Sequence, residues 1–102
     1  MIKMEYIIDK EKVLLTVLFN RSILKHLKCK CDDYLILLQS IHKSKLFTLA
    51  KADTGYRIRR VPKNRRMYQI NVSHRFSHIN EFPLVDCSYF LKKNRTIKIM
   101  LK

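Results

Sequence analysis

The residues with the most evident chemistry form a basic cluster at the middle of the chain. Six of the ten positions from 57 to 66 are basic: Arg57, Arg59, Arg60, Lys63, Arg65 and Arg66. No acidic residue lies between Asp53 and Glu81. Arg outnumbers Lys five to one in this cluster, and a guanidinium group binds phosphate bidentately and stacks on bases, which an ammonium does not. The cluster therefore predicts contact with a polyanion.

Aromatic and basic residues on either side extend this predicted surface. Tyr56 and Tyr68 flank the cluster, and their rings could stack on nucleic-acid bases. Arg75 lies between His74 and His78 in a short predicted helix, where it would add to a phosphate-facing surface. The alternative interpretation of the cluster is a solvated linker between two halves of the chain, and the sequence leaves that alternative open.

Two smaller basic zones could supply supporting contacts. They comprise Lys25, His26, Lys28 and Lys30 in the first zone and Lys92, Lys93 and Arg95 in the second. Both zones are expected at turns, so neither has to lie on the same side of the molecule as the cluster.

The overall charge favours the same class of partner. The chain of 102 residues has 22 Lys and Arg against 8 acids, a formal net charge of +14. Self-repulsion of this size opposes compaction unless a polyanion relieves it. Nucleic acid is the first candidate, with DNA favoured over RNA, and an anionic membrane surface is the second. A charge that serves only solubility is the remaining alternative.

Metal and catalytic chemistry have weak support in the sequence. A zinc site could be sought among His26, Cys29, Cys31 and His42. A Cys-x-Cys pair without a second cysteine pair is poor spacing for structural zinc. The set Cys29, His26 and Asp32 offers a nucleophile and a base, but no glycine for an oxyanion cradle. With Gly55 as the single glycine, a phosphate-binding glycine loop is excluded. We expect no catalytic residue, no metal, no cofactor and no enzymatic activity.

The patterns that would position these residues are mostly those of β-strands. The chain is short enough for a single domain, residues 1–102, and is 47% hydrophobic. Apolar or alternating runs predict strands at 13–19, 34–39, 46–51, 56–61, 67–73, 84–91 and 96–101. Short helices are expected at 21–27, with Asn20 as N-cap, and at 74–79, with Ser73 as N-cap. The fold class predicted is mainly β with two short helices.

The order of these elements predicts an internal repeat. Residues 13–51 and 67–101 each read as β-α-β-β, and residues 56–66 connect them. A shift of 53 residues places Phe19 on Val72 and Asp33 on Asp86. Two such units related by a pseudo-twofold axis can bury each other's apolar strands. We expect a compact barrel or sandwich, either a monomer with this pseudo-dimeric repeat or a homodimer.

The first repeat resembles the swapped-hairpin barrels of the AbrB and SpoVT transcription factors. The phrase "RSILKHLKCKCDDYLILL" is similar to that family's order of helix, leucine, loop ending in an acidic residue, and strand. The resemblance covers about 40 residues, mainly 13–51, with a fainter echo in 67–101. Lys28 and Lys30 stand where the family usually has glycine, and Arg21 stands where it often has proline. The resemblance implies a DNA-binding transcriptional regulator.

Other sequence features bear on location and on a rival function. The longest strongly apolar run, Val13 to Phe19, is far shorter than the roughly 20 residues of a membrane span. No signal peptide is recognisable, and three cysteines suit a reducing compartment. We expect an intracellular, cytoplasmic protein without a membrane partner. The rival interpretation is a non-enzymatic phage or mobile-element protein that inhibits a host nuclease complex by protein–protein contact.

Overall fold

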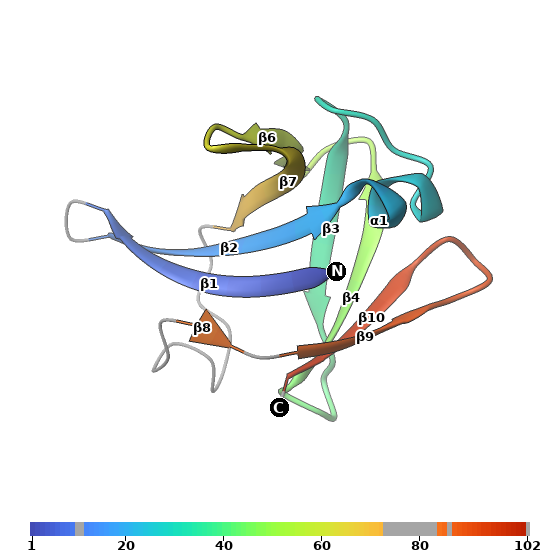
Figure 1. The fold of residues 1–102 in the computed structure, drawn as a ribbon. Coiled ribbons are helices and arrows are strands. Elements are labelled where there is room, and N and C mark those ends of the chain that lie inside the picture. Colours follow the sequence, from blue (N-terminus) through green and yellow to red (C-terminus); the bar gives the residue numbers. More distant parts are fainter. Residues whose placement is uncertain (10–11, 73–83, 86, 102) are drawn as a thin grey trace.

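Two antiparallel β-sheets that face each other make up the protein. The computed structural model describes residues 1–9, 12–72, 84–85 and 87–101 (Figure 1). The elements are β1 (Ile2–Asp9), β2 (Lys12–Asn20), α1 (Arg21–His26), β3 (Tyr34–Gln39), β4 (Leu46–Ala52), β5 (Tyr56–Arg57), β6 (Arg59–Val61), β7 (Asn64–Val72), β8 (Leu84–Val85), β9 (Cys87–Leu91) and β10 (Ile97–Leu101). The first sheet has the order β6-β7-β2-β1-β8, and the second has the order β5-β3-β4-β10-β9.

One strand segment passes from the edge of the second sheet to the edge of the first. Arg57, in β5, pairs with Tyr34 of the second sheet, and Arg60, in β6, pairs with Tyr68 of the first. Ile58 between them is fully buried. Its N–H donates to the Asp33 carbonyl at 2.8 Å, and its carbonyl accepts from the Asp32 N–H at 3.0 Å. The bend therefore leaves neither of these buried backbone groups unpaired.

The core lies between the sheets and follows the two-residue period of strands. Its largest fully buried side chains come from both sheets and from the helix and include Met4, Leu15, Phe19, Ile23, Leu27, Leu35, Phe47, Leu49, Ile58, Ile70 and Ile97. Each such side chain contributes about 1.5–3 kcal/mol by leaving water. Because the inward faces of both sheets carry these residues, the core holds the sheets in one relative position.

Helix α1 is short and is fixed at both ends by local hydrogen bonds. The Asn20 side chain accepts from the Ile23 N–H at 3.4 Å, which confirms the predicted N-cap. At the other end Lys28 has φ of 56°, and its N–H donates to the Lys25 carbonyl. The Cys29 N–H donates to the Leu24 carbonyl at 3.1 Å, completing a Schellman motif. Lys28 thus adopts the left-handed conformation that glycine usually takes at this position.

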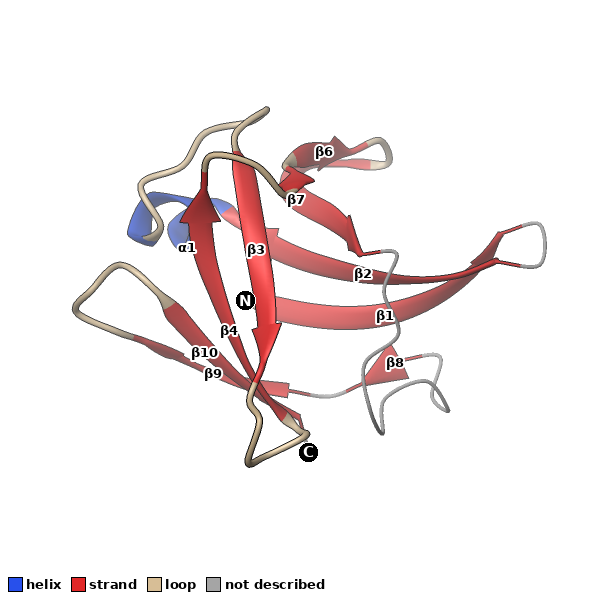
Figure 2. Ribbon diagram, turned by 180° about the vertical axis from the view of Figure 1, so that it is seen from behind, coloured by secondary structure: helices blue, strands red, loops and turns tan. Residues whose placement is uncertain are grey.

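The outer face of the second sheet is largely apolar and open. Leu38, Thr48, Lys98 and Phe90 form one cross-strand row on it, through the pairs Leu38↔Thr48, Lys98↔Thr48 and Lys98↔Phe90. Leu38 is 56% exposed and Phe90 54%. The Lys98 ammonium donates to the Thr48 hydroxyl at 2.6 Å. In Figure 2 no other described strand or helix crosses in front of β3 and β4 on this side.

The structure confirms a mainly β fold and corrects several details. The strand predicted at 34–39 is β3 without change, and those predicted at 46–51 and 96–101 differ from β4 and β10 by one residue at one end. Strand β1 was not predicted, although it forms a full hairpin with β2. Arg65 and Arg66 were expected in a loop but lie in β7, because Pro62 and Lys63 alone form the turn from β6. The helix expected at 74–79 lies outside the described residues.

A substitution at Gly55 should destabilise the fold measurably. Gly55 has φ of +148°, and a Cβ there would lie 2.5 Å from the backbone oxygen of Leu35. Because the backbone of β3 cannot move aside cheaply, Gly55→Ala should lower the free energy of unfolding by about 2 kcal/mol or more. Urea denaturation followed by circular dichroism measures the change. Thr54→Ala, at the exposed neighbouring position, should stay within about 0.5 kcal/mol, and equal effects of the two variants would contradict the steric argument.

Candidate functional site

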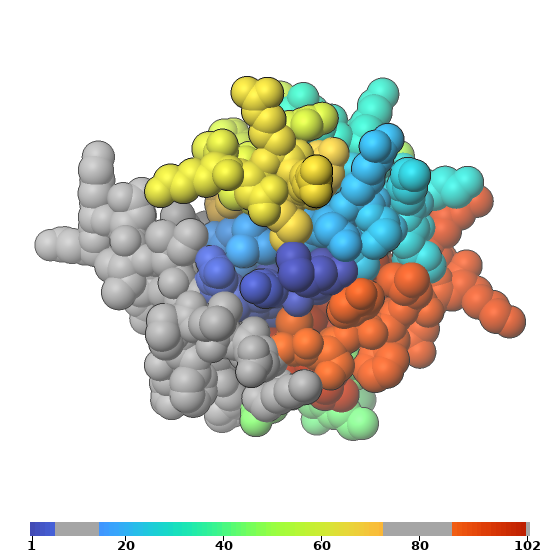
Figure 3. All heavy atoms as spheres, in the orientation of Figure 1, coloured from blue at the N-terminus to red at the C-terminus, as the bar shows by residue number. Residues whose placement is uncertain are grey.

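A basic hollow lies between helix α1, the loop that follows it and the β6–β7 hairpin. Its volume is about 860 Å³. The described residues that line it are Asn20, Arg21, Ser22, Leu24, Lys25, Cys29, Lys30, Cys31, Arg60, Arg65, Arg66 and Tyr68. In Figure 3 the atoms of the hairpin (yellow) lie beside those of α1 (light blue) on one face of the molecule. We call this feature the basic hollow.

Six cations surround the basic hollow from two directions. Arg21, Lys25 and Lys30 come from the helix and its loop, and Arg60, Arg65 and Arg66 come from the hairpin. None of the described lining residues is Asp or Glu. A concave surface lined by one sign of charge concentrates counter-ions and speeds the approach of an anionic ligand. The electrostatics of the hollow therefore favour an anionic group over a neutral or cationic one.

The floor of the hollow is apolar. Leu24 and Tyr68 are buried, with Tyr68 only 8% exposed, and Cys29 and Cys31 are half-buried against the core. The Tyr68 ring stacks on Phe19 with centroids 6.3 Å apart. Burial is the main cause that raises the pKa of the Cys29 thiol, with Lys51 opposing and Asp33 reinforcing the shift. A neutral thiol keeps the floor free of negative charge.

Of the two tyrosines named from the sequence, Tyr68 is covered by a side chain and Tyr56 does not line the basic hollow. The Arg60 guanidinium lies over the Tyr68 ring, 5.6 Å from its centroid. Arg60 itself is exposed, so the group that covers the ring reaches into the hollow. Tyr56 is half-buried beside the core, and burial raises the pKa of its phenol. The structure thus places a guanidinium where the sequence predicted an aromatic ring.

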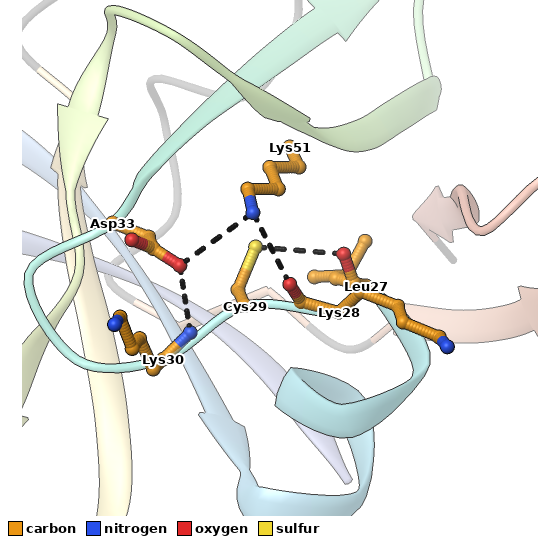
Figure 4. Close-up of polar contacts among 6 residues, drawn as sticks. All are labelled: Leu27, Lys28, Cys29, Lys30, Asp33 and Lys51. Atoms are coloured by element: carbon orange, nitrogen blue, oxygen red, sulfur yellow. Dashed lines mark hydrogen bonds and ion pairs between the residues drawn. The ribbon is translucent and has the colours of Figure 1, made fainter.

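The loop after α1 is held in place by two hydrogen bonds and an ion pair that involve Asp33 and Lys51 (Figure 4). The Asp33 carboxylate accepts from the Lys30 N–H at 2.9 Å and pairs with the Lys51 ammonium at 3.8 Å. That ammonium also donates to the Lys28 carbonyl at 3.3 Å. Asp33 therefore positions Lys30 on the wall of the hollow.

The remaining residues of the basic cluster have different surroundings. Arg57 is paired with Asp32, its Nε and Nη2 both 3.0 Å from Oδ1. Arg59 lines a smaller neighbouring hollow with Arg57 and Asp32. Lys63 is exposed at the hairpin turn and does not line the basic hollow. Arg75 lies outside the described residues.

Three cations of the hollow were not placed there by sequence reasoning. Lys25 and Lys30 belong to a basic zone whose position relative to the basic cluster could not be predicted from the sequence. No role was predicted for Arg21. Arg21 and Lys25 are four residues apart in α1, which puts them on one helix face. That spacing was a usable signal, but only the β2–β7 pairing shows which surface this face borders.

Among the described residues, no group of three or more His, Cys, Asp or Glu side chains is arranged to hold a metal ion. His26 instead contacts the Thr96 carbonyl through Nε2 at 3.1 Å. Within the described part of the chain, no helix has the length and apolarity needed to cross a bilayer.

The thiol of Cys29 should react slowly with an alkylating reagent. Because burial raises its pKa, less thiolate is present at a given pH, and the thiolate is the nucleophile. Iodoacetamide modification of Cys29, measured by mass spectrometry between about pH 7 and 10 in a Cys31→Ser/Cys87→Ser background, should show a midpoint above that of the urea-unfolded chain. A midpoint at or below the unfolded value would contradict the burial of this thiol.

Comparison with known proteins supplies no relative for this chain. No family model, no curated protein and no solved structure matches it. A functional assignment therefore depends on the geometry and charge of the basic hollow.

Proposed function

We propose that this chain is a small, non-enzymatic nucleic-acid-binding protein. The observation that carries the proposal is the basic hollow, in which six cations from α1, its loop and the β6–β7 hairpin gather without a lining carboxylate among the described residues. Nucleic acid is the polyanion whose regular phosphates suit several closely spaced guanidinium groups. The reducing, cytoplasmic location expected from the odd number of cysteines is part of this proposal.

Within this proposal the cations differ in role. Arg60, Arg65 and Arg66 line the hollow and contact phosphates or bases, while Arg59 and Lys63, which do not line it, add phosphate contacts outside it. Arg57 contributes less, because the Asp32 carboxylate compensates its charge. A DNA-binding transcriptional regulator is the form of this function that the AbrB/SpoVT-like resemblance favours.

We also propose that the fold is a tandem repeat with a pseudo-twofold axis. The shift of 53 residues makes Val17 equivalent to Ile70, and these two residues are paired in β2 and β7. A shift of 50 residues makes Thr48 equivalent to Lys98, and these are paired in β4 and β10. When a twofold axis passes between two antiparallel strands, the equivalent residues nearest the axis pair with each other. The β2–β7 register and the β4–β10 register each contain such a pair, and both therefore support the proposal.

Charge reversal at the hollow should weaken nucleic-acid binding strongly. We expect Arg65→Glu/Arg66→Glu to lower affinity for DNA at least tenfold and to reduce the slope of log K against log salt by about 2, since each phosphate contact contributes about 0.9. Fluorescence anisotropy with labelled DNA and RNA duplexes and single strands, from about 50 to 200 mM salt, measures both quantities.

The control for this experiment is Lys43→Glu/Lys45→Glu. These residues lie in the exposed β3–β4 turn, which Figure 1 shows at the opposite end of β3 and β4 from the hairpin. The control makes the same change in net charge, so a similar loss with both variants would indicate only nonspecific attraction. Absence of binding to any DNA or RNA at low salt would refute the proposal.

A second candidate function is favoured by the outer face of the second sheet. Exposed apolar area on a small protein often marks a protein interface, and Leu38 and Phe90 stand at the two ends of the cross-strand row that contains Lys98. A carboxylate of an acidic partner could pair with the Lys98 ammonium inside such a contact. This arrangement supports a protein-interaction role, of which the rival function, inhibition of a host nuclease complex, is one form.

Variants of the outer face separate this candidate from the first. If it is correct, the protein should retain an acidic protein from nuclease-treated lysate of cells that naturally contain it, and Leu38→Ser/Phe90→Ser should abolish this capture. Arg65→Glu/Arg66→Glu should leave the capture unchanged, because those residues lie on the hollow. Capture that disappears on nuclease treatment, or that survives the apolar double substitution, would contradict a protein interface on this face.

A further inference from the structure

The basic hollow combines a cationic wall with an apolar floor, and the backbone of a duplex would contact only the first of these. Its walls carry cations, but its floor is made of Leu24, Cys29, Cys31 and the covered ring of Tyr68. In a duplex the base faces are stacked on one another, and the surface presented to a protein is phosphate, sugar and base edges. Pressing phosphates against an apolar floor would remove their water without supplying hydrogen bonds.

An unpaired nucleotide matches both parts of the hollow. Its phosphate can contact the cations on either wall, and its base has two apolar faces that can cover the floor. The occupant needs negative charge on its outer side and a flat aromatic surface on its inner side. A single strand supplies these features at every nucleotide.

The position of Arg60 adds a specific stacking site. Its guanidinium is held over the Tyr68 ring at 5.6 Å from the centroid, and Tyr68 is in turn stacked on Phe19. A guanidinium is planar and stacks through both of its faces. Because Arg60 is exposed beyond the ring, a face of its guanidinium that is turned away from Tyr68 can receive a base in the arrangement proposed below.

Building on the proposed function, we propose that the basic hollow binds single-stranded nucleic acid, with an unpaired base stacked on Arg60 and the adjoining phosphates held by the cations of the two walls. Arg60 provides both charge and a stacking plane, whereas Arg65 and Arg66 provide charge alone. Recognition of this kind is tolerant of sequence, because every base has a π-face.

A binding cycle tests the stacking contact directly. The probes are an oligodeoxythymidylate of about twelve nucleotides, an abasic oligomer of the same length and charge, and the corresponding duplex, each measured by fluorescence anisotropy at about 50 mM salt. We expect the full-length wild-type chain to bind the oligodeoxythymidylate about tenfold more tightly than the abasic oligomer. It should also prefer the single strand to the duplex.

The variant Arg60→Lys keeps the charge and removes the plane. It should lower affinity for the oligodeoxythymidylate to nearly that of the abasic oligomer, and it should leave affinity for the abasic oligomer within about twofold. Substitution of Arg60 and removal of the base are then non-additive, as expected for two groups in direct contact. Thermal denaturation establishes that the variant is folded. If it is not folded, the wild-type comparison of base-carrying, abasic and duplex probes decides the matter by itself.

The outcomes distinguish this inference from the proposed function. Equal binding of the abasic and base-carrying strands, or tighter binding of the duplex, would overturn the single-strand inference while leaving a nucleic-acid-binding protein. If Arg60→Lys lowered affinity for the base-carrying and the abasic single strands by the same factor, the stacking role of Arg60 would be overturned. Absence of binding to all three probes would refute the proposed function as well.

Discussion

The crossing of residues 56–61 from one sheet to the other is the constraint on which the rest of the structure depends. A strand that leaves a sheet exposes backbone groups, and burying them without partners costs free energy. Here the buried Ile58 exchanges two backbone hydrogen bonds with Asp32 and Asp33, the residues that precede β3. The same contact joins the hairpin segment to the loop after α1, so the two walls of the basic hollow are fixed relative to each other.

Repulsion between like charges explains why the two walls of the basic hollow have to be fixed by hydrogen bonds and packing. Six cations around one hollow repel one another, and the chain as a whole has a formal charge of +14. Local devices offset part of this repulsion: Asp32 pairs with Arg57, Asp33 with Lys51, and the Arg60 guanidinium lies on the Tyr68 ring. The hollow itself has no such compensation from a lining carboxylate among the described residues, and a bound polyanion would supply it.

Much of the fold could be predicted because strands and turns are encoded locally. The apolar run of β3, the turn before it with its two aspartates, and the Asn20 cap of α1 are all recognisable from neighbouring residues. Strand β1 was not predicted, although its first residues alternate apolar and charged side chains, a pattern that indicates a half-buried strand. Its pairing with β2 along its whole length shows the strand. The packing of Tyr68 could not be predicted either, since no local pattern shows that its ring packs on Phe19 beneath Arg60.

The sequence by itself determined the kind of fold and supplied the hypothesis of a polyanionic ligand, because net charge, the density of arginines and the two-residue apolar period are properties of composition and order. It could not determine which basic residues act together. Arg21 and Lys25 join Arg60, Arg65 and Arg66 around one hollow only because β2 and β7 are neighbours, and Arg57 leaves the set only because Asp32 lies next to it. These proximities depend on hydrogen-bonded pairing and core packing between segments distant in the chain, so the tertiary structure alone decided them.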